Sequence, residues 1–555
     1  MPYKYRRIFI SVLILLLSGL AVWLFPDYKH SSRRAGPATN LQPNITLSTQ
    51  EAPCKNEHPE WRQAQVIDGV EIAASQLCDP DNPYDIAVAV KGANNVSMRT
   101  LMNTHFSQDA ITLGNDLDHD GDPDEVNIRL EVMELNGFSP DGDFLAFTYN
   151  TAPGIQPGLW VFAPKTSDMA TKNFRSRETH YVLRAPSPAI RVEQGDRVNI
   201  TLENTHYFPH TIHLHGVDHA WRNSKGEDND GVDHEPVYPG TSKTYEIQPR
   251  HAGTMLYHCH VQTDKHMMMG LSGMFIVEEN RPNNWVQTFN IGAGHVRHPS
   301  VGVLEEYAQE YDLHYQSVDN EMASIIQEFN DPRLINKKMH RQYSITGAHE
   351  DQFLLNGHSF PYTLRDALIV AQPNQNIKLR IANSQNSAIA LHIHGHKATI
   401  TDYDGVSRPK EQQITRDVFD IAPAQRLDLN LATIDDGVHS YGPGLWMFHD
   451  HIENGITTNG MSPGGNMALM AYASLLNEQG MPNGHSGMDE FFSPAFYAKE
   501  VPLWGDGEFA SLLGDVELLN PDYLRIICFG VLLGLIIVLV LFLIRGFRQG
   551  DQHAK

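Results

Sequence analysis

Ile190-Arg-Val-Glu-Gln-Gly-Asp-Arg-Val-Asn-Ile-Thr-Leu202 alternates apolar and polar side chains on both sides of a Gly-Asp turn. Alternation with a period of two residues is typical of a β-strand with one buried face. The turn between the two runs favours a β-hairpin. Residues 369–381 repeat the pattern, so this unit is expected twice in the chain.

The repeat continues beyond this segment at a constant spacing. An offset of 179 residues relates Val198 to Ile377 and Gly216 to Gly395. Residues 253–260 then match residues 444–451 at an offset of 191, so a loop of the second copy is 12 residues longer. Because a sheet with one apolar face must bury it against another layer, the repeat predicts an all-β fold with two similar β-sandwich domains.

The overall composition is that of a folded protein with room for two or three domains. The 555 residues are 41% hydrophobic and 19% charged, which is ordinary for globular proteins. The formal net charge of −24 argues against nucleic acid, which needs basic contacts to its phosphates. Cations are the partners that such a charge favours.

Two uncharged apolar runs, residues 8–25 and 526–544, are each long enough to cross a bilayer as a helix. Acids before the second run and bases after it predict a cytoplasmic C-terminal tail. For the first run, a membrane anchor and a cleaved signal segment both fit. In either case we expect a protein of the cytoplasmic membrane whose catalytic domains are periplasmic or at the cell surface, where Cys54 and Cys78 are free to form a disulfide.

These patterns divide the chain into seven parts. In order, they are residues 1–30, an N-terminal transmembrane anchor or signal segment; 31–125, an extracytoplasmic extension; 126–280, the first sandwich; 281–345, a connector; 346–480, the second sandwich; 481–522, a juxtamembrane segment; and 523–555, a C-terminal transmembrane helix and tail. Within the connector, the apolar spacing predicts a helix over 319–329, closed by Pro332.

Four His-x-His pairs occupy the predicted strands: His213/His215, His258/His260, His392/His394 and His449/His451. Side chains two residues apart in a strand point to the same face, about 6–7 Å from each other. Each pair can therefore direct two imidazoles at neighbouring metal ions. Scattered core histidines explain one such pair but not four in register within a repeat.

The residue between His258 and His260 is Cys259, which points to the opposite face of its strand. With His210 and His266 it offers two imidazoles and a thiolate, the ligand set of a blue electron-transfer copper. A catalytic zinc site needs only about three protein ligands, whereas eleven residues converge here. The pattern therefore favours several copper ions.

The motifs at 210–216 and 258–261 resemble those of the multicopper oxidase family, which is built of cupredoxin domains, and the resemblance covers residues 126–480. It implies one type 1, one type 2 and two type 3 coppers per functional unit. Type 1 copper would be held by His210, Cys259 and His266, and type 2 copper by His213 and His392. The type 3 pair would be held by the remaining histidines: His215, His258, His260, His394, His449 and His451.

The chain departs from the family pattern in three ways. Ile389 and Asp450 replace the counterparts of His210 and Cys259, so the second domain should hold no type 1 copper. The step from Cys259 to His266 is two residues longer than in laccase-like relatives; counting onward gives Leu271 as the axial residue, with methionines at 267–269 as alternatives. Type 1 copper lies in the first domain, an order that resembles two-domain oxidases and copper nitrite reductases.

The resemblance implies an oxidoreductase that takes single electrons from a reducing substrate and gives four to dioxygen, forming water. Asp230 resembles the acid that relatives place near type 2 copper to supply protons, although an aspartate before a glycine also suits a turn. Two rival functions are a nitrite reductase-like enzyme, which would carry aspartate in place of His213, and a non-enzymatic copper-binding protein, which needs no cysteine between paired histidines.

The electron donor is open between a metal ion, such as Cu(I) or Fe(II), and a phenol. The acidic loop 227–235 could attract a cation, and thioethers suit Cu(I). Equally, acids solvate loops and methionines fill cores. The methionines concerned are Met267, Met268, Met269, Met461, Met467, Met470, Met481 and Met488.

Residues 116–127 follow the first positions of a calcium-binding loop, with Asp116, Asp118 and Asp120 in ligand positions and Gly121 after them. The twelfth position is Asn127 instead of a bidentate glutamate. Calcium binding and a solvated acidic turn both fit this pattern.

Each sandwich carries half of the predicted cluster, and residues 281–345 show no His-x-His pair. In relatives with the same domain order, the first domain of one subunit faces the second domain of its neighbour. A head-to-tail interface must close into a ring or grow into a fibre. The resemblance therefore implies a membrane-anchored homotrimer.

Overall fold

The computed structural model describes most of the region between the predicted membrane spans. The described residues are 110–137, 149–164, 184–204, 206–217, 235–239, 241–329, 332–478, 480, 482 and 489–500, with short strands at 65–67, 70–72, 221–222 and 228–229. The predicted spans, the Cys54 and Cys78 pair and Asp230 lie outside them. No helix among the described residues is long and apolar enough to cross a bilayer.

The described residues form two β-sandwiches, so the all-β prediction is confirmed. The first sandwich pairs two five-stranded sheets. Its first sheet contains β3 (Ile111–Leu113), β4 (Glu125–Leu135), β5 (Leu159–Pro164), β7 (Arg197–Glu203) and β11 (Ser242–Ile247). Its second sheet contains β6 (Ala189–Glu193), β8 (His213–His215), β12 (Gly253–His258), β13 (Ser272–Glu278) and β14 (Phe289–Asn290).

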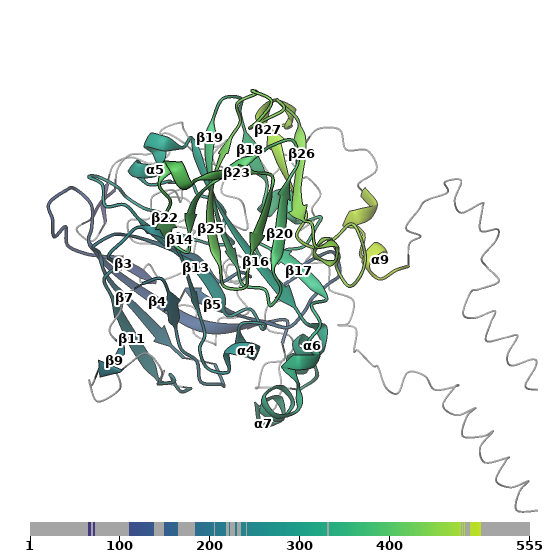
Figure 1. Cartoon of the computed structure of the whole chain (residues 1–555). Coiled ribbons are helices and arrows are strands. Elements are labelled where there is room, and N and C mark those ends of the chain that lie inside the picture. The colour runs from purple at the N-terminus through teal and green to yellow at the C-terminus, as the bar shows by residue number, and fades with distance from the viewer. Residues whose placement is uncertain are drawn as a thin grey trace, which may run out of the picture. The chain divides into compact units, whose positions relative to one another are not determined.

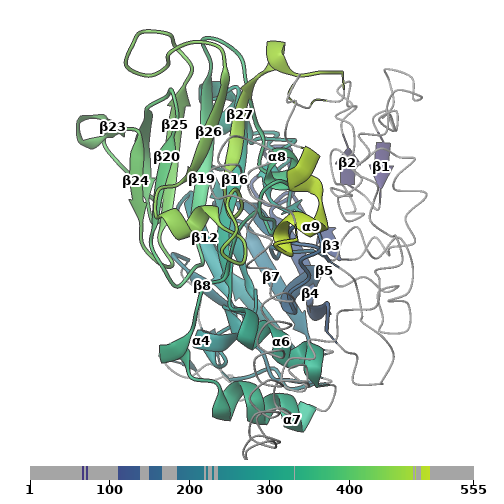
Figure 2. The same ribbon diagram turned by 90° about the vertical axis from the view of Figure 1, so that its right-hand side faces the viewer.

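The second sandwich pairs an eight-stranded third sheet with a five-stranded fourth sheet. The third sheet contains β15 (Gly294–His295), β16 (Gln309–Val318), β17 (Gln352–Leu355), β19 (Asn376–Asn383), β21 (Ala398–Tyr403), β22 (Val406–Ser407), β23 (Ile414–Arg416) and β25 (Arg426–Ala432). The fourth sheet contains β18 (Ile369–Ala371), β20 (Ile389–Ile393), β24 (Val418–Ile421), β26 (Leu445–Asp450) and β27 (Ala468–Tyr472). Figure 1 labels strands of both sandwiches, and in Figure 2 the labelled strands of the second sandwich lie above those of the first.

Helices are short and lie between the strands: α4 (Thr263–His266), α5 (Val301–Glu306), α6 (Asn320–Glu328), α7 (Pro332–Asn336), α8 (Thr363–Asp366) and α9 (Pro494–Tyr497). A π-helical turn, η3 (Lys337–Gln342), continues α7. Helix α6 confirms the helix predicted at 319–329, and the Asp319 side chain caps its start. Pro332 begins α7 rather than closing α6, a position where proline loses no hydrogen bond.

The predicted hairpin at 190–202 is wrong. Strand β6 belongs to the second sheet and β7 to the first, so the Gly-Asp turn crosses from one layer of the sandwich to the other. Strands β18 and β19 are split in the same way. Alternation of apolar and polar residues shows only which face of a strand is buried. The same pattern is expected for two strands in opposite sheets and for two paired neighbours in one sheet.

Residues 281–345 also differ from the prediction of a simple connector. They contain β16, which pairs in parallel with β19 inside the third sheet. The described part of the second sandwich therefore begins before residue 346. On the other side, β3 pairs with β4 and extends the first sheet to residues before 126.

Apolar side chains fill three successive gaps between the four sheets. One core includes Ile128 of the first sheet and Phe275 of the second. Another includes Leu429 of the third sheet and Leu391 of the fourth. A smaller cluster joins the second and third sheets, where Leu256, Met274 and Ile276 meet Ala382. The sheets are thus stacked in order, with the second and third at the junction of the sandwiches.

A buried network of ion pairs crosses this junction. Arg191 of the second sheet lies 2.8 Å from Asp312 and 3.1 Å from Glu310, both on β16 of the third sheet. Arg380 of the third sheet reaches back to Glu278 of the second at 2.9 Å. These guanidinium groups each bond to several carboxylates, which is the arrangement that compensates the desolvation of buried charge.

Replacing Arg191 with methionine should lower the free energy of unfolding by about 3–5 kcal/mol, because it leaves buried carboxylates without their cation. Urea unfolding measures the change. Arg281→Met is the control, since its pair with Glu279 is 41% and 59% exposed and such pairs contribute about 0–1 kcal/mol. Equal unfolding midpoints for the two variants would contradict the role of this network.

Candidate metal centre

Four histidines of the first copy gather along strands β8 and β12, where β8 forms an edge of the second sheet. His213 lies opposite His258 in the antiparallel register. The Nε2 atoms of His215 and His258 are 2.9 Å apart, and the rings of His213 and His260 are 4.7 Å apart. Nitrogen atoms of His213, His215 and His258 all lie within 4.8 Å of one another, close enough to share metal ions.

The second copy repeats this arrangement on β20 and β26 of the fourth sheet. His392 lies opposite His449, and the Nε2 atoms of His394 and His449 are 3.1 Å apart. His451 lies 5.4 Å from His449, ring to ring, and its side chain is 54% exposed. This set is therefore open to its surroundings on one side.

Backbone carbonyls fix the tautomers of two of these histidines. Nδ1 of His258 is 2.8 Å from the carbonyl oxygen of Cys259, and Nδ1 of His449 is 2.8 Å from that of Asp450. A carbonyl only accepts, so in each ring Nδ1 carries the proton and Nε2 keeps its lone pair. Each lone pair faces another imidazole nitrogen, which a shared cation would satisfy.

His210, Cys259 and His266 converge in the core of the first sandwich, where all three are fully buried. The Cys259 Sγ atom is 3.6 Å from Nδ1 of His210 and 3.3 Å from Nδ1 of His266. The long step between Cys259 and His266 contains α4, which returns the chain toward the sulfur. Two imidazoles and a sulfur thus face one point.

The charge states of this trio fit a soft metal ion. Burial raises the pKa of the Cys259 thiol to about 11, so a bound cation is needed to hold it as a thiolate at neutral pH. Burial also lowers the pKa values of His210 and His266 well below the usual range. Both imidazoles are therefore neutral and keep a lone pair for copper.

Leu271, predicted as the axial residue, is fully buried in the same core. Its carbonyl accepts a hydrogen bond from the Cys259 backbone N–H at 3.1 Å, which places Leu271 beside the sulfur-bearing residue. Among the alternatives, the Met268 sulfur lies 3.8 Å from the Tyr343 hydroxyl oxygen. The identity of the axial group stays a prediction.

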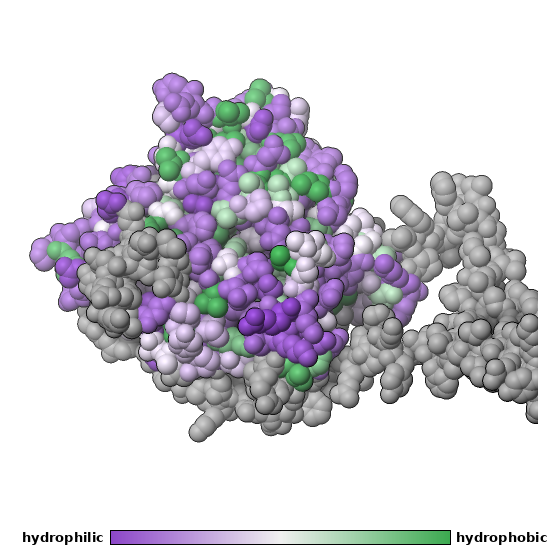
Figure 3. All heavy atoms as spheres, turned by 60° about the horizontal axis from the view of Figure 1, so that its bottom comes forward, coloured by the Kyte–Doolittle hydropathy of each residue, from purple (hydrophilic) through white to green (hydrophobic). Residues whose placement is uncertain are grey.

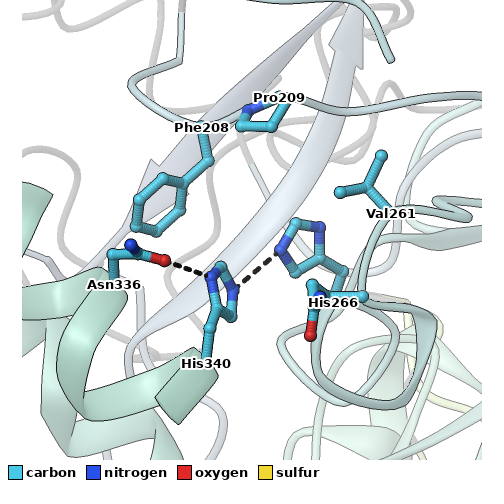
Figure 4. Close-up of a pocket in the computed structure, with 7 residues that line it drawn as sticks. Phe208, Pro209, Val261, His266, Asn336 and His340 are labelled. Carbon is cyan, nitrogen blue, oxygen red and sulfur yellow. Dashed lines mark hydrogen bonds between the residues drawn. The ribbon is translucent and has the colours of Figure 1, made fainter. Parts of the chain in front are cut away.

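Two further histidines, which the sequence did not single out, bond to the outer nitrogens of His210 and His266. Nδ1 of His206 lies 2.9 Å from Nε2 of His210, and the opposite edge of His206 faces Glu134 at 3.8 Å. Nε2 of His340 lies 3.2 Å from Nε2 of His266 (Figure 4). Neither belongs to a His-x-His pair, so no local motif marked them.

His340 comes from η3, about 74 residues along the chain from His266. The amphipathic spacing of Ile335 and Met339, both fully buried, is the sequence signal that could have placed this segment against the first sandwich. It could not have shown that His340 would reach His266.

Ile389 and Asp450 are the predicted replacements of type 1 ligands in the second copy. Both stabilise the second sandwich. Ile389 is fully buried in the core of the second sandwich. One oxygen of the Asp450 carboxylate accepts hydrogen bonds from the backbone N–H groups of Ala390 and Ile452, at 2.8 and 3.0 Å. No cysteine lies near them among the described residues, where Cys259 is the free cysteine.

The two histidine sets lie on different layers of the stack. The first belongs to the second sheet and the second to the fourth, with the third sheet between them. Among the described residues, the groups of metal-ligating side chains that lie within 4.8 Å of one another contain no mixture of the two sets. Within one chain, the two histidine sets therefore remain separate.

Other predicted features have mixed outcomes. Asp116, Asp118 and Asp120 bring carboxylate oxygens within 4.8 Å of one another, whereas Asn127 bonds to Asn199 on the neighbouring strand. Calcium binding by this loop stays a prediction. Most of the acidic loop at 227–235, Asp230 included, lies outside the described residues.

The described methionines mainly fill cores. Met268 and Met269 are buried in the first sandwich, and Met470 in the second. Met461 is buried against Phe496 and Tyr497 of α9. Their burial favours the packing interpretation over a thioether site for Cu(I).

Comparisons with known proteins agree with this geometry. Two profiles described as multicopper oxidase match residues 171–282 and 334–463. The multicopper oxidase MmcO of Mycobacterium tuberculosis is 27% identical over 241 residues, which are 40% of this chain and 41% of that protein. The multicopper oxidase mco of Staphylococcus aureus is 24% identical over 222 residues, 38% of this chain and 41% of that protein.

Among solved structures, the blue copper oxidase from Nitrosomonas europaea is similar with a TM-score of 0.46 and 24% identity, covering 67% of this chain and 93% of that one. The alignments to the two curated relatives span only about two fifths of those proteins' own length. The profile matches are more specific, because one contains the Cys259 trio with the first histidine set and the other contains the second set. Residues 171–282 and 334–463 of this chain thus match the multicopper oxidase family.

Proposed function

We propose that this protein is a copper-dependent oxidase that removes single electrons from a reducing substrate and reduces dioxygen to water. When bound, copper would take up electrons at His210, Cys259 and His266 and reduce dioxygen at the eight paired histidines. By the family resemblance, His213 and His392 would hold type 2 copper and the other six paired histidines the type 3 pair.

The observation that carries this proposal is the position of Cys259 between His258 and His260. The Cys259 sulfur faces His210 and His266 inside the sandwich, whereas the His258 ring meets His213 and His215. Two kinds of metal site thus share one short stretch of backbone. Such a link suits electron transfer between them, and metal storage would not require it.

Two other functions are less well supported. A nitrite reductase-like enzyme would carry aspartate at position 213, where this chain has a histidine packed against His258 and His260. A copper-buffering protein would not need a buried thiol between two histidines. The donor remains open between a metal ion and a phenol.

We infer that a second subunit completes each cluster. Within one chain the buried network of Arg191 and Arg380 fixes the third sheet between the two half-sites. The exposed side of His451 leaves the second half-site free to meet a partner. A head-to-tail contact that closes with three subunits satisfies all half-sites, in agreement with the predicted homotrimer.

Anchoring in the cytoplasmic membrane, with the sandwiches periplasmic or at the cell surface, is part of the same proposal. It rests on the apolar runs at 8–25 and 526–544. Protease protection of the C-terminal tail in sealed membrane vesicles tests the orientation. The proton-donating role of Asp230 rests on the family resemblance alone.

Replacing His449 with alanine should abolish oxygen uptake yet keep the blue colour, because His449 lies on the fourth sheet and the type 1 ligands lie in the first sandwich. Visible absorption and an oxygen electrode report the two properties separately. His439→Ala is the matched control, since His439 is in the same sandwich and pairs with Asp436 near the surface. Loss of the blue band in His449→Ala, with the fold intact, would contradict this division of ligands.

The direct test of the proposal is oxygen uptake by the copper-loaded protein in the presence of a one-electron dye. We expect uptake that depends on both the dye and copper. Copper binding without any uptake would favour the storage alternative.

A further inference from the structure

The outer edge of the type 1 ligand His266 is covered by His340. His266 is fully buried, and its Nε2 atom meets Nε2 of His340 at 3.2 Å. Nδ1 of His340 is in turn 2.8 Å from Oδ1 of Asn336. Figure 4 shows the three side chains in a row, from the protein interior to the α7–η3 segment.

If Nδ1 of His266 keeps its lone pair for copper, one set of proton positions satisfies this row. With Nδ1 of His266 directed at the Cys259 sulfur, its Nε2 carries the proton and donates to Nε2 of His340. His340 then carries its own proton on Nδ1 and donates it to the amide oxygen of Asn336. The row is a continuous chain of hydrogen bonds from the metal ligand to the surface, with no charged group in it.

The α7–η3 segment, which carries His340, is packed against the first sandwich. Ile335 and Met339 are both fully buried in the core of the first sandwich. Tyr343, just after the turn, donates a hydrogen bond to Asp319 at 2.7 Å. His340 therefore lies on a fixed surface element rather than on a free loop.

A pocket of about 460 Å³ opens beside this row. Its lining is apolar or neutral, with Phe208, Pro209 and Val261 on one side and Gln262, His266, Asn336 and His340 on the other. The His340 ring lies 5.1 Å from that of Phe208. A small molecule in this pocket would touch His340, whereas His266 is fully buried.

The η3 segment, which contributes His340 to the pocket, is basic in a protein of net charge −24. Lys337, Lys338 and Arg341 are all exposed on η3, and no acid occurs between residues 332 and 348. Lys265 also lies near His340, although its ammonium is 2.6 Å from the Asp264 carboxylate, which offsets it. In Figure 3, which turns the lower face of Figure 1 toward the viewer, the exposed surface is largely hydrophilic.

We propose that an anionic one-electron donor binds at the α7–η3 segment and delivers its electron to the type 1 site through His340. The donor is oxidised by one electron and the copper ion held by Cys259 is reduced by one, with no bond broken and no proton transferred. The exposed cations of η3 attract the anion locally against the repulsion of the whole molecule. The electron-transfer part of this inference rests on the proposed function, but the anion site does not.

The site is tested first without copper. Binding of hexacyanocobaltate(III), an anion that does not exchange electrons under these conditions, is measured by titration calorimetry on the full-length, copper-free protein. We expect Lys337→Glu/Arg341→Glu to weaken binding about tenfold or more. Arg197→Glu/Lys499→Glu is the matched control, since it changes the net charge equally at exposed positions in other elements. Equal binding by both double variants would overturn the anion site.

The route is tested by anaerobic reduction of the blue band in stopped flow, with hexacyanoferrate(II) and hexaammineruthenium(II) as donors of opposite charge. The η3 double variant should be reduced about tenfold more slowly by the anion and no more slowly by the cation. His340→Leu should be reduced more slowly by both donors, with its blue band retained as evidence of folding. Unchanged rates in His340→Leu would overturn the route.

The outcomes separate this inference from the proposed function. A protein that stays colourless with copper contradicts the proposed function, while the calorimetric comparison still decides whether the anion site exists. If the protein is blue and consumes oxygen, but the η3 double variant and His340→Leu are reduced at the wild-type rate, the proposed function stands and the inference is overturned.

Discussion

Replacing Cys259 with serine should remove the blue colour of the copper-loaded protein and reduce oxygen uptake to the assay background. The colour of such a site comes from a thiolate bound to copper between two imidazoles, and a serine hydroxyl is too weak a ligand to replace it. Because His258 and His260 flank the mutated residue and remain, most of the cluster copper should stay bound. Metal analysis and visible absorption measure the two effects on the same sample.

The control for this variant is Met274→Leu, which alters a fully buried side chain on β13, the strand that pairs with β12. Such volume-conserving changes usually cost less than about 1.5 kcal/mol, so colour and activity should persist. A Cys259→Ser protein that remains blue, or that still consumes oxygen at the wild-type rate, would show that Cys259 is not the electron-accepting ligand.

Mixing two inactive variants, His213→Ala and His392→Ala, during refolding should restore oxygen uptake. Each variant destroys one half-site and keeps the other. In a ring where the first sandwich of one subunit faces the second sandwich of its neighbour, about one quarter of the interfaces in an equal mixture would join two intact halves. We therefore expect about a quarter of the wild-type activity from two preparations that are inactive alone.

A mixture of His213→Ala with His258→Ala is the matched control. Both changes lie in the first half-site, so no interface can contain an intact one and no activity should return. The mass of the detergent-solubilised protein provides an independent measurement. Full copper content in a monomer would contradict the shared cluster and require the two sandwiches of one chain to face each other differently.

Much of this site could be predicted from the sequence because most of its candidate ligands lie within a few residues of one another along the chain. Residues two apart in a strand share a face, so the two histidines of each pair could be expected to point the same way. The structure also places His213 of β8 opposite His258 of β12. Helix α6 at 320–328 was likewise predictable from local sequence, because its apolar spacing and its N-cap Asp319 lie within one short segment.

What the sequence could not provide was non-local. The alternation in β6 and β7 was correct for burial, but it could not show that the strands belong to opposite sheets. Strand β16 lay in a segment without a motif; it pairs with β19, and its Glu310 meets Arg191 of another sheet. His340 depends on the same long-range folding, because a π-helical turn brings it to His266.

The central claim, that this chain couples single-electron oxidation to the complete reduction of dioxygen, is tested most directly by counting electrons. The copper-loaded protein is supplied with a one-electron dye, and dye oxidised, oxygen consumed and peroxide formed are measured together. The account predicts four dye molecules oxidised per dioxygen consumed, with no peroxide accumulating. Two dye molecules per dioxygen with matching peroxide, or dye oxidation without oxygen consumption, would contradict it.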